Sequence, residues 1–398
     1  MKILFLTSAF PSSDHPKSNA HNLRSVLNLS TAPTLEIQVV HLRSWRPWRK
    51  IFVKTQLHGM EVWSYSFPFY PRLPKLLLGM LLIIYKKTLY HFFLKKNMQN
   101  VDVIHTAGVA MESVVGAYIS KKTGLKHVAQ SMGGDVNFDL PRLSRTPGWL
   151  GFEKHVNVFC CNSISLQKQL KKIYPSAKSE VIYRGVNLDE FDYEPLSESP
   201  GNTFTFLYLG GLVTDAKHDQ YNSKGGVTLL EAWLMLINSI GIEKDNVELI
   251  FCGPHVNNDV IAEILGQSPG SVSIKVVGQV SIHGVKHYIA QSDVIIVPSL
   301  TEGLPNVAME AAAIGRPVIG SEVGGIPEIV INGETGFLFQ ADNVKELCDL
   351  IKFYIKNPEQ MQTHGLNARK HVVKNFNSKS FTENYMKLYK NFKSKISL

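Results

Sequence analysis

The residues with the clearest chemical potential are two glutamates, Glu302 and Glu310, in the segment Ser292–Leu338. Glu302 follows a buried apolar run, Asp293–Pro298, and precedes a predicted helix, where free backbone N–H groups and the helix dipole favour an anion such as phosphate. Glu310 falls on the apolar stripe of that helix, where a carboxylate is costly unless it has a partner. The pair indicates a site for a polar ligand. Alternatively, Glu310 pairs with Arg316 and Glu302 is a solvated loop residue.

The predicted helix is bounded by residues typical of helix ends. Pro305 occupies the first helical position, and Gly315 follows the last residue of the apolar pattern. Val307, Ala311 and Ile314 recur at i, i+4 and i+7, which predicts the face that packs on the sheet. The unit is therefore a strand, a loop and a helix.

Apolar, β-branched runs alternate with helical patterns along the chain, which predicts parallel strands connected by helices. One series starts at the strand Lys2–Leu6, and a second starts at Phe204–Leu209 after a polar linker containing Pro and Gly. We predict an α/β fold of two facing Rossmann-like, doubly wound domains with an interdomain cleft, where ligands of such sheets bind. The predicted domains are 1–196, 197–375 and a C-terminal helix, 376–398, that packs back on the first domain.

Length and cysteine usage limit the class of protein. A chain of 398 residues predicts two domains, and its four cysteines form no CxxC pair, which favours a reduced, cytoplasmic compartment. The apolar run at the start of the sequence is shorter than that of a signal peptide, so it is interpreted as the first strand. The apolar stretch Leu76–Tyr85 is about half of the length that a bilayer span needs, so a transmembrane helix is not expected.

The net charge of +9 is unevenly distributed. The segment Arg43–Asn100 contains eleven Lys or Arg residues and one acidic residue, Glu61, together with several aromatic side chains. This pattern is typical of a peripheral contact with an anionic membrane, which predicts a location on the inner face of the plasma membrane. A buried helix with a solvated basic face is the alternative. Nucleic acid is not an expected partner, because no recognition motif accompanies the charge.

The segment Ser273–Phe339 resembles the nucleotide-sugar-binding domain of retaining glycosyltransferases of family four, which have the GT-B fold. The matching pieces include Val277–Val280, Gly324–Glu328 and Asn332–Gly336. Glu302 and Glu310 match the E-x(7)-E motif of that family. The resemblance implies that Glu310 accepts hydrogen bonds from the ribose of a nucleoside-diphosphate sugar, and that Glu302 contacts the transferred sugar.

The resemblance also assigns Lys224 to the diphosphate, where a fixed cation stabilises the leaving group; the alternative is a solvated lysine. Asp135, at the predicted cleft, completes the predicted catalytic set with Glu302 and Lys224 by positioning the acceptor, although a loop-capping role is equally compatible with the sequence. Besides Glu310, the expected donor-binding residues are Gly303, Leu304, Pro305, Asn306, Gly210, Gly211, Gly278 and Ser299.

Three features depart from the family pattern, one of which is that Ser18, Asn19 and Ala20 stand in place of the family's glycine-rich acceptor-side loop after the first strand. Gly211 stands where the family has an arginine, and Arg184 or Lys217 are candidates for the missing cation. Met132 replaces the histidine of a His-Gly-x-Asp loop, so the acceptor side is predicted at Met132, Gly133 and Gly134.

The predicted function is transfer of a sugar from a UDP- or GDP-sugar to a saccharide acceptor, with retained configuration, in the synthesis of a surface polysaccharide or glycoconjugate. A lipid-linked acceptor is favoured by the basic segment. No Asp-x-Asp motif is present, so neither a metal nor another cofactor is expected. The alternatives are a soluble acceptor and a nucleotide-sugar-binding protein without turnover.

Overall fold

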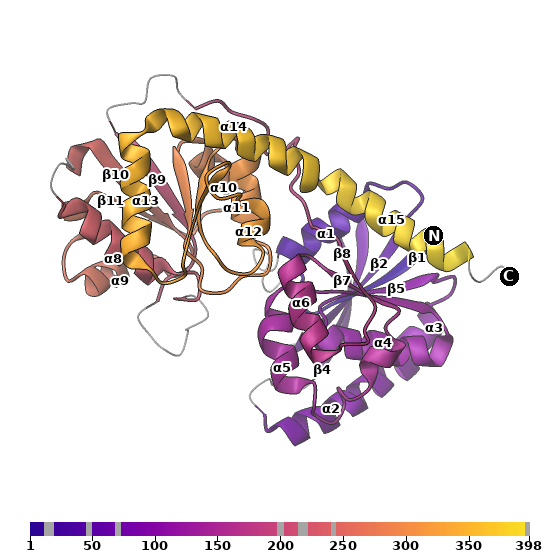
Figure 1. Ribbon diagram of the computed structural model, residues 1–398. Helices are drawn as coiled ribbons and strands as arrows, with labels where there is room; N and C mark the ends of the chain where they lie inside the picture. The colour runs from indigo at the N-terminus through magenta and orange to yellow at the C-terminus, as the bar shows by residue number, and fades with distance from the viewer. Residues whose placement is uncertain are drawn as a thin grey trace. The chain divides into compact units, whose positions relative to one another are not determined.

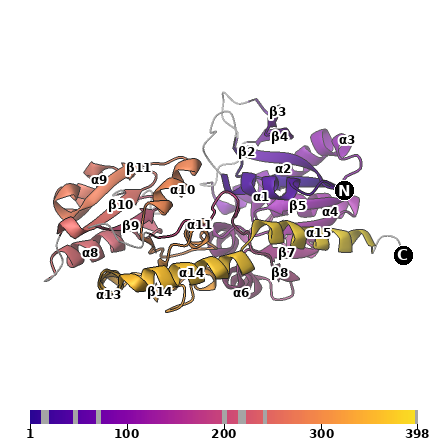
Figure 2. The same cartoon turned by 90° about the horizontal axis from the view of Figure 1, so that it is seen from above.

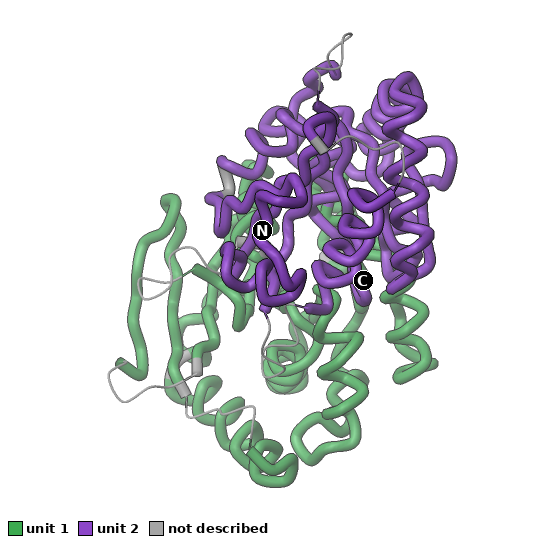
Figure 3. The backbone as a smooth tube through the Cα atoms, turned by 90° about the vertical axis from the view of Figure 1, so that its left-hand side faces the viewer, with its two compact units in different colours: residues 1–184, 379–398 green, residues 185–378 purple. Residues whose placement is uncertain are grey.

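Two α/β units make up the chain: Met1–Arg184 with Lys379–Leu398 form unit 1, and Gly185–Ser378 form unit 2 (Figure 3). The computed structural model describes residues 1–11, 20–44, 50–67, 73–196, 203–213, 222–239 and 244–394. In each unit, helices cover a sheet of mostly parallel strands (Figure 1). None of the described helices is long and apolar enough to cross a membrane.

The described sheet of unit 1 has the strand order β3-β4-β2-β1-β5-β6-β7-β8. The central strand β1 pairs in parallel with β2 and β5. Ile3 to Leu6 are fully buried, as expected for a parallel strand covered on both faces. The strands are β1 (Lys2–Thr7), β2 (Glu36–Ser44), β3 (Phe52–Leu57), β4 (Met60–Phe67), β5 (Val103–Ala107), β6 (Lys126–Gln130), β7 (Val158–Cys161) and β8 (Ser179–Val181).

β3 and β4 form an antiparallel hairpin at the sheet edge that the sequence analysis did not predict. His58 and Gly59 make its two-residue turn with φ values of 50° and 75°, the left-handed values of a type I′ turn. Lys54 in β3 is exposed, so the alternation of buried and exposed residues is weak there. The glycine-containing pair between two β-rich runs is the signal that identifies such a hairpin.

The last helix, α15 (Ser378–Ser394), lies beside α1 (Ala20–Ser30) on unit 1 (Figures 1 and 2), where Thr382 Oγ1 donates to Asn28 O at 2.9 Å. Tyr385 and Tyr389 are fully buried in this core. The other helices of unit 1 are α2 (Lys75–Thr88), η1 (Leu89–Leu94), α3 (Lys95–Asn97), α4 (Met111–Thr123), η2 (Asp135–Asp139), α5 (Leu140–Leu143), η3 (Phe152–His155) and α6 (Ile164–Ile173).

His105 in β5 connects α15 to the sheet. Its Nδ1 atom accepts a hydrogen bond from the Tyr389 hydroxyl, and its Nε2 atom donates to Gln130 Oε1 at 3.1 Å. Burial lowers the pKa of His105 to about 4, so the ring is neutral at physiological pH. The aromatic residues spaced along α15 are thus buried against unit 1, and Tyr389 among them is hydrogen-bonded to His105.

In unit 2 the described strands are all parallel, in the order β11-β10-β9-β12-β13-β14. The first strand of the unit, β9, is central. The chain moves outward from β9 to β10 and β11, then returns to β12 on the other side of β9. The strands are β9 (Phe204–Leu209), β10 (Val247–Cys252), β11 (Ile274–Gly278), β12 (Val294–Val297), β13 (Val318–Ser321) and β14 (Gly336–Phe339).

The helix that carries Glu310 is α11 (Asn306–Ile314). Pro305 is the N-cap residue of α11, whereas the sequence predicted it as the first helical residue. Gly315 ends the helix in a left-handed conformation with φ of 95°. Burial extends beyond the predicted sheet-facing residues, because every residue from Ala308 to Ile314 is buried. The helices α10, α12 and α14 also pack on α11, so its sides are covered as well as its sheet-facing surface.

The remaining described helices of unit 2 flank these elements (Figure 1). They are α8 (Gly226–Ile237), η5 (Lys244–Asn246), α9 (Asn258–Leu265), η6 (Pro269–Val272), α10 (Ile282–Ala290), α12 (Ile326–Ile329), α13 (Val344–Lys356) and α14 (Pro358–Asn375).

The boundary of the units lies between Arg184 and Gly185, earlier than the predicted division between 196 and 197. Residues after 184 are held by unit 2: Arg369 Nη1 donates to Phe191 O at 3.0 Å, and Glu194 N donates to Ile314 O at 3.0 Å. The two segments that connect unit 2 to unit 1, one at each end of residues 185–378, lie next to each other. Val186 N donates to Phe376 O at 2.8 Å, and Ser378 N donates to Val186 O at 3.0 Å.

We predict that Gly365→Ala destabilises unit 2, because a Cβ atom there would lie 2.1 Å from Gly315 O at the end of α11. The loss in unfolding free energy should be about 1–3 kcal/mol, measured by urea unfolding. Gly270→Ala is the matched control, since no heavy atom lies within 4 Å of its added Cβ. Equal stability of the two variants would contradict the close packing of α14 on α11.

Candidate functional site

The carboxyl edge of the unit 2 sheet changes direction between β9 and β12. The connections after these two neighbouring strands lead away to opposite sides of the strand order. Such a switch point leaves a crevice outside the strand ends, which is where doubly wound sheets bind ligands. The loop after β12 carries Glu302, and the segment before α8 carries Lys224.

Two close backbone contacts hold these segments together. Gly225 has φ of 72°, and a Cβ atom on it would lie 1.8 Å from Pro298 O. Leu300 N donates to Ser223 O at 2.8 Å. The absence of a side chain at Gly225 therefore lets the segment with Lys224 lie against the loop after β12.

Lys224 and Glu302 form an ion pair through Nζ and Oε1. The Glu302 side chain is 14% exposed and that of Lys224 is 41% exposed, so the pair opens to solvent on the lysine side. Gly303 N donates to Glu302 Oε2 at 3.2 Å. The segment before α12 holds the backbone of this loop, because Gly325 N donates to Gly303 O at 2.8 Å. The structure thus brings together two residues that the sequence analysis placed in one site.

Glu310 is 5% exposed and lies in the second turn of α11. The alternative partner considered for it, Arg316, uses all three guanidinium nitrogens on backbone carbonyls. Nε donates to Ser292 O at 2.8 Å, Nη1 to Glu194 O at 2.5 Å and Nη2 to Ala290 O at 2.6 Å. Arg316, which follows α11, therefore binds the end of α10, the turn before β12 and the segment that precedes β9.

The expected donor-binding residues come from different connections at the carboxyl edge of the unit 2 sheet. Gly303, Leu304, Pro305 and Asn306 form the turn into α11, and Ser299 accepts a hydrogen bond from the Ser321 hydroxyl. Gly210 and Gly211 follow β9, next to β12, and Gly211 O accepts from the Tyr208 hydroxyl at 3.1 Å. Gly278 ends β11, which β10 and β9 separate from β12.

The loop after β6 in unit 1 is organised around Asp135. Its carboxylate accepts backbone N–H groups from Val109 at 2.9 Å, Met132 at 3.0 Å, Gly133 at 2.8 Å and Val136 at 2.9 Å. Burial raises the pKa of Asp135, and these donors act in the opposite direction. The contacts are those of the loop-capping alternative.

The predicted acceptor-side residues have different exposures. Gly133 is buried with φ of 130°, Met132 is half-buried and Gly134 is exposed. A Cβ atom on Gly134 would lie 3.8 Å from Phe138, which is ordinary contact. Position 134 therefore has room for a side chain, whereas the backbone of Gly133 requires glycine.

Glu112, in the first turn of α4, is a buried carboxylate that the sequence analysis did not identify. Its Oε1 atom accepts hydrogen bonds from the Ser8 backbone N–H at 3.1 Å and from the Ser8 hydroxyl. Gly108 has φ of 131°, and a Cβ there would lie 2.5 Å from Glu112 Cδ. Burial raises the pKa of Glu112 to about 7, the Ser8 hydroxyl opposes this, and the negative charge of Asp135 adds to it. No local sequence signal distinguishes this residue from an ordinary acid at a helix start.

Of the candidate cations suggested for the position of Gly211, Lys217 lies outside the described residues, and Arg184 is buried at the end of unit 1. Within the described ranges, no three His, Cys, Asp or Glu side chains gather in a way that could hold a metal ion.

Comparison with solved structures identifies the fold. Sucrose-phosphate synthase from Thermosynechococcus elongatus has a TM-score of 0.74 and 19% identity, covering 99% of this chain and 100% of that chain. Anabaena HepE in complex with UDP has a TM-score of 0.68 and 18% identity, covering 98% and 100%. The α/β fold with two Rossmann-like units is therefore the GT-B fold of glycosyltransferases, as predicted.

The family comparison is more specific for unit 2. Residues 206–371 match the family model described as glycosyl transferases group 1, a range that includes Lys224, Glu302 and Glu310. The chain is 24% identical over 359 residues to the putative teichuronic acid biosynthesis glycosyltransferase TuaC of Bacillus subtilis, covering 83% of each protein. Residues 206–371 of the chain are therefore similar to the group 1 glycosyltransferases.

We predict that Glu112→Gln changes how stability depends on pH. Because the pKa of Glu112 is raised from 4.5 to about 7 in the folded chain, its contribution is fully present below pH 4.5 and is lost as pH rises to about 7. The loss is about 3 kcal/mol by linkage, so Glu112→Gln should be more stable than the parent above pH 7. Urea unfolding from pH 4.5 to 8 measures this, with Glu383→Gln on the exposed face of α15 as control. A parallel pH dependence of parent and Glu112→Gln would contradict the raised pKa.

Proposed function

We propose that the protein is a retaining glycosyltransferase that moves a sugar from a nucleoside-diphosphate sugar to a hydroxyl of a saccharide acceptor. The observation that carries this proposal is the Lys224–Glu302 ion pair at the switch point of the unit 2 sheet, inside the range that matches the group 1 family. The UDP complex of HepE, a protein of the same fold, supports a nucleotide donor.

In this proposal Lys224 binds the donor diphosphate. Its side chain is 41% exposed and its ammonium group is held by Glu302, so an arriving diphosphate can take over the cation without a rearrangement of the backbone. Departure of the nucleoside diphosphate leaves negative charge on the phosphate oxygen, which a preorganised cation stabilises more than it stabilises the ground state. Glu302, once released from Lys224, accepts hydrogen bonds from hydroxyls of the transferred sugar.

Glu310 serves as the acceptor for the ribose hydroxyls of the donor. A buried carboxylate is stabilised by hydrogen-bond donors, and two neighbouring hydroxyls supply them. The start of α11 adds the backbone N–H groups of Gly303, Leu304 and Asn306 and the positive end of the helix dipole, which favour the diphosphate. Pro305 has no N–H group, and its fixed φ shapes the turn instead.

The reaction breaks the bond between the anomeric carbon and the diphosphate oxygen and forms a bond from the same carbon to the acceptor oxygen on the same face. The acceptor proton passes to the departing phosphate side. Lys224 and α11 neutralise the developing charge, and the activity is proposed to need no metal and no cofactor. No enzyme nucleophile is assigned.

The acceptor is proposed to be a lipid-linked saccharide at the inner, cytoplasmic face of the plasma membrane, bound by unit 1 beside Met132, Gly133 and Gly134. The similarity to a protein named for teichuronic acid biosynthesis supports a role in surface polysaccharide or glycoconjugate synthesis. A protein that binds nucleotide sugars without turnover is the second candidate, which the departures at Gly211 and Met132 favour.

Turnover separates these two candidates. The purified chain is incubated with UDP- and GDP-sugars, with and without polyprenyl-linked saccharides, and release of nucleoside diphosphate is followed in EDTA. The anomeric configuration of the product is read by proton NMR. Binding of donors without any release would favour the binding protein, and an inverted product would exclude retention.

Lys224→Met should lower kcat by roughly a hundredfold or more, because it removes the cation that stabilises the leaving diphosphate. Lys286→Met is the matched control: Lys286 is also ion-paired in unit 2, with Asp192 and Glu194, but on different elements. Steady-state kinetics with saturating donor measures the effect. The assignment of Lys224 is lost if both variants retain the kcat of the parent.

Glu310→Gln should weaken the binding of a nucleoside diphosphate by about tenfold, because a neutral amide accepts weaker hydrogen bonds from ribose hydroxyls than a carboxylate does. Isothermal titration calorimetry with UDP and GDP measures this. Glu263→Gln, at an exposed position of α9, is the control. Unchanged affinity in a variant that unfolds at the parent temperature removes the ribose role of Glu310.

A further inference from the structure

The helix α2 and the turns that follow it expose an unusual set of large apolar side chains. Their exposed fractions are between 44% and 74%, although side chains of these types are most often buried in folded proteins. α2 lies at an outer edge of unit 1 (Figure 1). The exposed residues are Leu76, Leu77, Met80, Ile84 and Phe92.

The outward orientation of these side chains is fixed by the opposite face of α2. Leu78, Leu82 and Tyr85 are buried in the core of unit 1. Gly79 fits against the segment that follows α5, since a Cβ atom there would lie 2.0 Å from Pro147 O. The helix cannot rotate its exposed apolar stripe inward without breaking this packing.

Positive charge borders the apolar stripe. The described range 73–100 contains no Asp or Glu, whereas Lys75, Lys87, Lys95 and Lys96 are exposed. Lys122 of α4 adds to this charge: its ammonium group and that of Lys86 in α2 lie 5.9 Å and 5.8 Å from the Tyr118 ring centroid. Burial is the largest cause of the lowered pKa of Lys86, and the positive charges of Lys87 and Lys121 lower it further. These lysines therefore repel one another in the protein alone.

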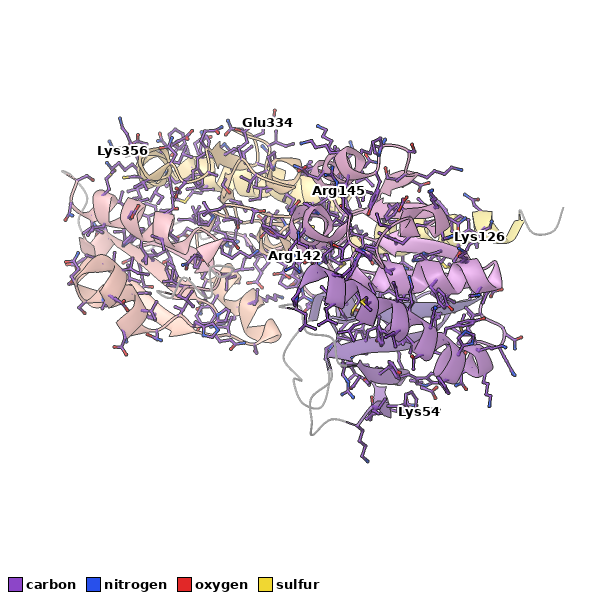
Figure 4. The ribbon with its side chains drawn as sticks, turned by 90° about the horizontal axis from the view of Figure 1, so that it is seen from below. Lys54, Lys126, Arg142, Arg145, Glu334 and Lys356 are labelled. Atoms are coloured by element: carbon purple, nitrogen blue, oxygen red, sulfur yellow. The ribbon has the colours of Figure 1, made fainter. Side chains whose placement is uncertain are left out.

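The other part of the basic segment is used within unit 1. Lys54 projects from the β3–β4 hairpin (Figure 4), where it pairs with Glu61 at 2.5 Å and lies 5.8 Å from the Trp63 ring centroid. Arg43 is buried, and its Nη2 atom donates to Lys50 O at 3.5 Å. Trp45 and Trp48 lie outside the described residues. Among the described residues of the basic segment, the exposed lysines and the exposed apolar side chains thus lie together on the range from α2 to α3.

We propose that the surface formed by α2, η1 and α3 binds an anionic lipid bilayer, with Leu76, Met80 and Ile84 inserted among the headgroups and the flanking lysines on lipid phosphates. This inference deepens the proposed function by naming the surface that brings unit 1 to a lipid-linked acceptor. The chemistry fits both requirements of peripheral binding, apolar area and basic charge.

A bilayer explains the charge better than a second copy of the chain does. In a twofold dimer the same patch contacts itself, so the lysines of one copy would face those of the other. Like charges brought together in this way oppose association, whereas phosphate headgroups neutralise them. The surface therefore favours lipid over self-association.

The test is co-sedimentation of the full chain with vesicles of phosphatidylglycerol and phosphatidylcholine, and with phosphatidylcholine alone. Met80→Ser with Ile84→Ser removes apolar area, and Lys87→Gln with Lys95→Gln and Lys96→Gln removes charge. The matched controls are Met235→Ser with Leu366→Ser, exposed in unit 2, and Lys168→Gln with Lys171→Gln and Lys172→Gln, exposed on α6.

We expect binding to the anionic vesicles to fall by at least about tenfold in each α2 variant and to be unchanged in the controls. Equal binding of the α2 variants and the controls overturns the proposal. Dimerisation of the parent that is lost in Met80→Ser with Ile84→Ser, without vesicle binding, assigns the surface to a second copy instead. Vesicle binding requires no turnover, so its failure is distinct from failure of the glycosyltransferase proposal, which UDP binding and diphosphate release test.

Discussion

The contact of Gly225 with the carbonyl of Pro298 is the constraint on which the candidate site of unit 2 depends. It brings the segment before α8 against the loop after β12, at the point where the strand order reverses. A lysine on one segment then reaches a glutamate on the other, although 78 positions separate them. Any side chain at Gly225 would separate the two segments, so a backbone requirement precedes the chemistry of Lys224 and Glu302.

The features that the sequence predicts correctly are those with local signals. The strand at Asp293–Pro298 and the helix after it follow from an apolar run, a proline and a glycine, and the structure has β12 and α11 there. Full burial of α11 could not be predicted, because it depends on α14, which comes some fifty residues later in the chain. The environment of Glu112 also depends on contacts between separate segments, because Ser8 follows β1 and Gly108 follows β5. The sequence alone therefore did not identify Glu112. For Asp135 the sequence allowed two roles: hydrogen bonds from four backbone N–H groups show the loop-capping one, and positioning of the acceptor stays a prediction.

The charged residues discussed above differ in whether the fold itself supplies a group that neutralises their charge. Lys224 has Glu302, and Asp135 has four backbone donors, so these charges are satisfied within the fold. At Glu112, burial favours the neutral form of the carboxyl group. At Lys86, the neighbouring charges are of the same sign, which an anionic external surface can compensate. Lys224 is neutralised by Glu302 and is also partly exposed, so in the proposed function its partner can be exchanged for an anionic ligand.

The adjacent hydrogen bonds of Val186 to Phe376 and Ser378 have a topological consequence. Residues 185–378 form a continuous domain inserted into unit 1 between β8 and α15, and the entry and exit of the insertion are joined by backbone hydrogen bonds. Closely spaced ends are what allow one domain to be inserted into another without separating the elements on either side. Since α15 follows residues 185–378 in the chain, the hydrogen bond between His105 and Tyr389 can form only after the inserted domain has been synthesised.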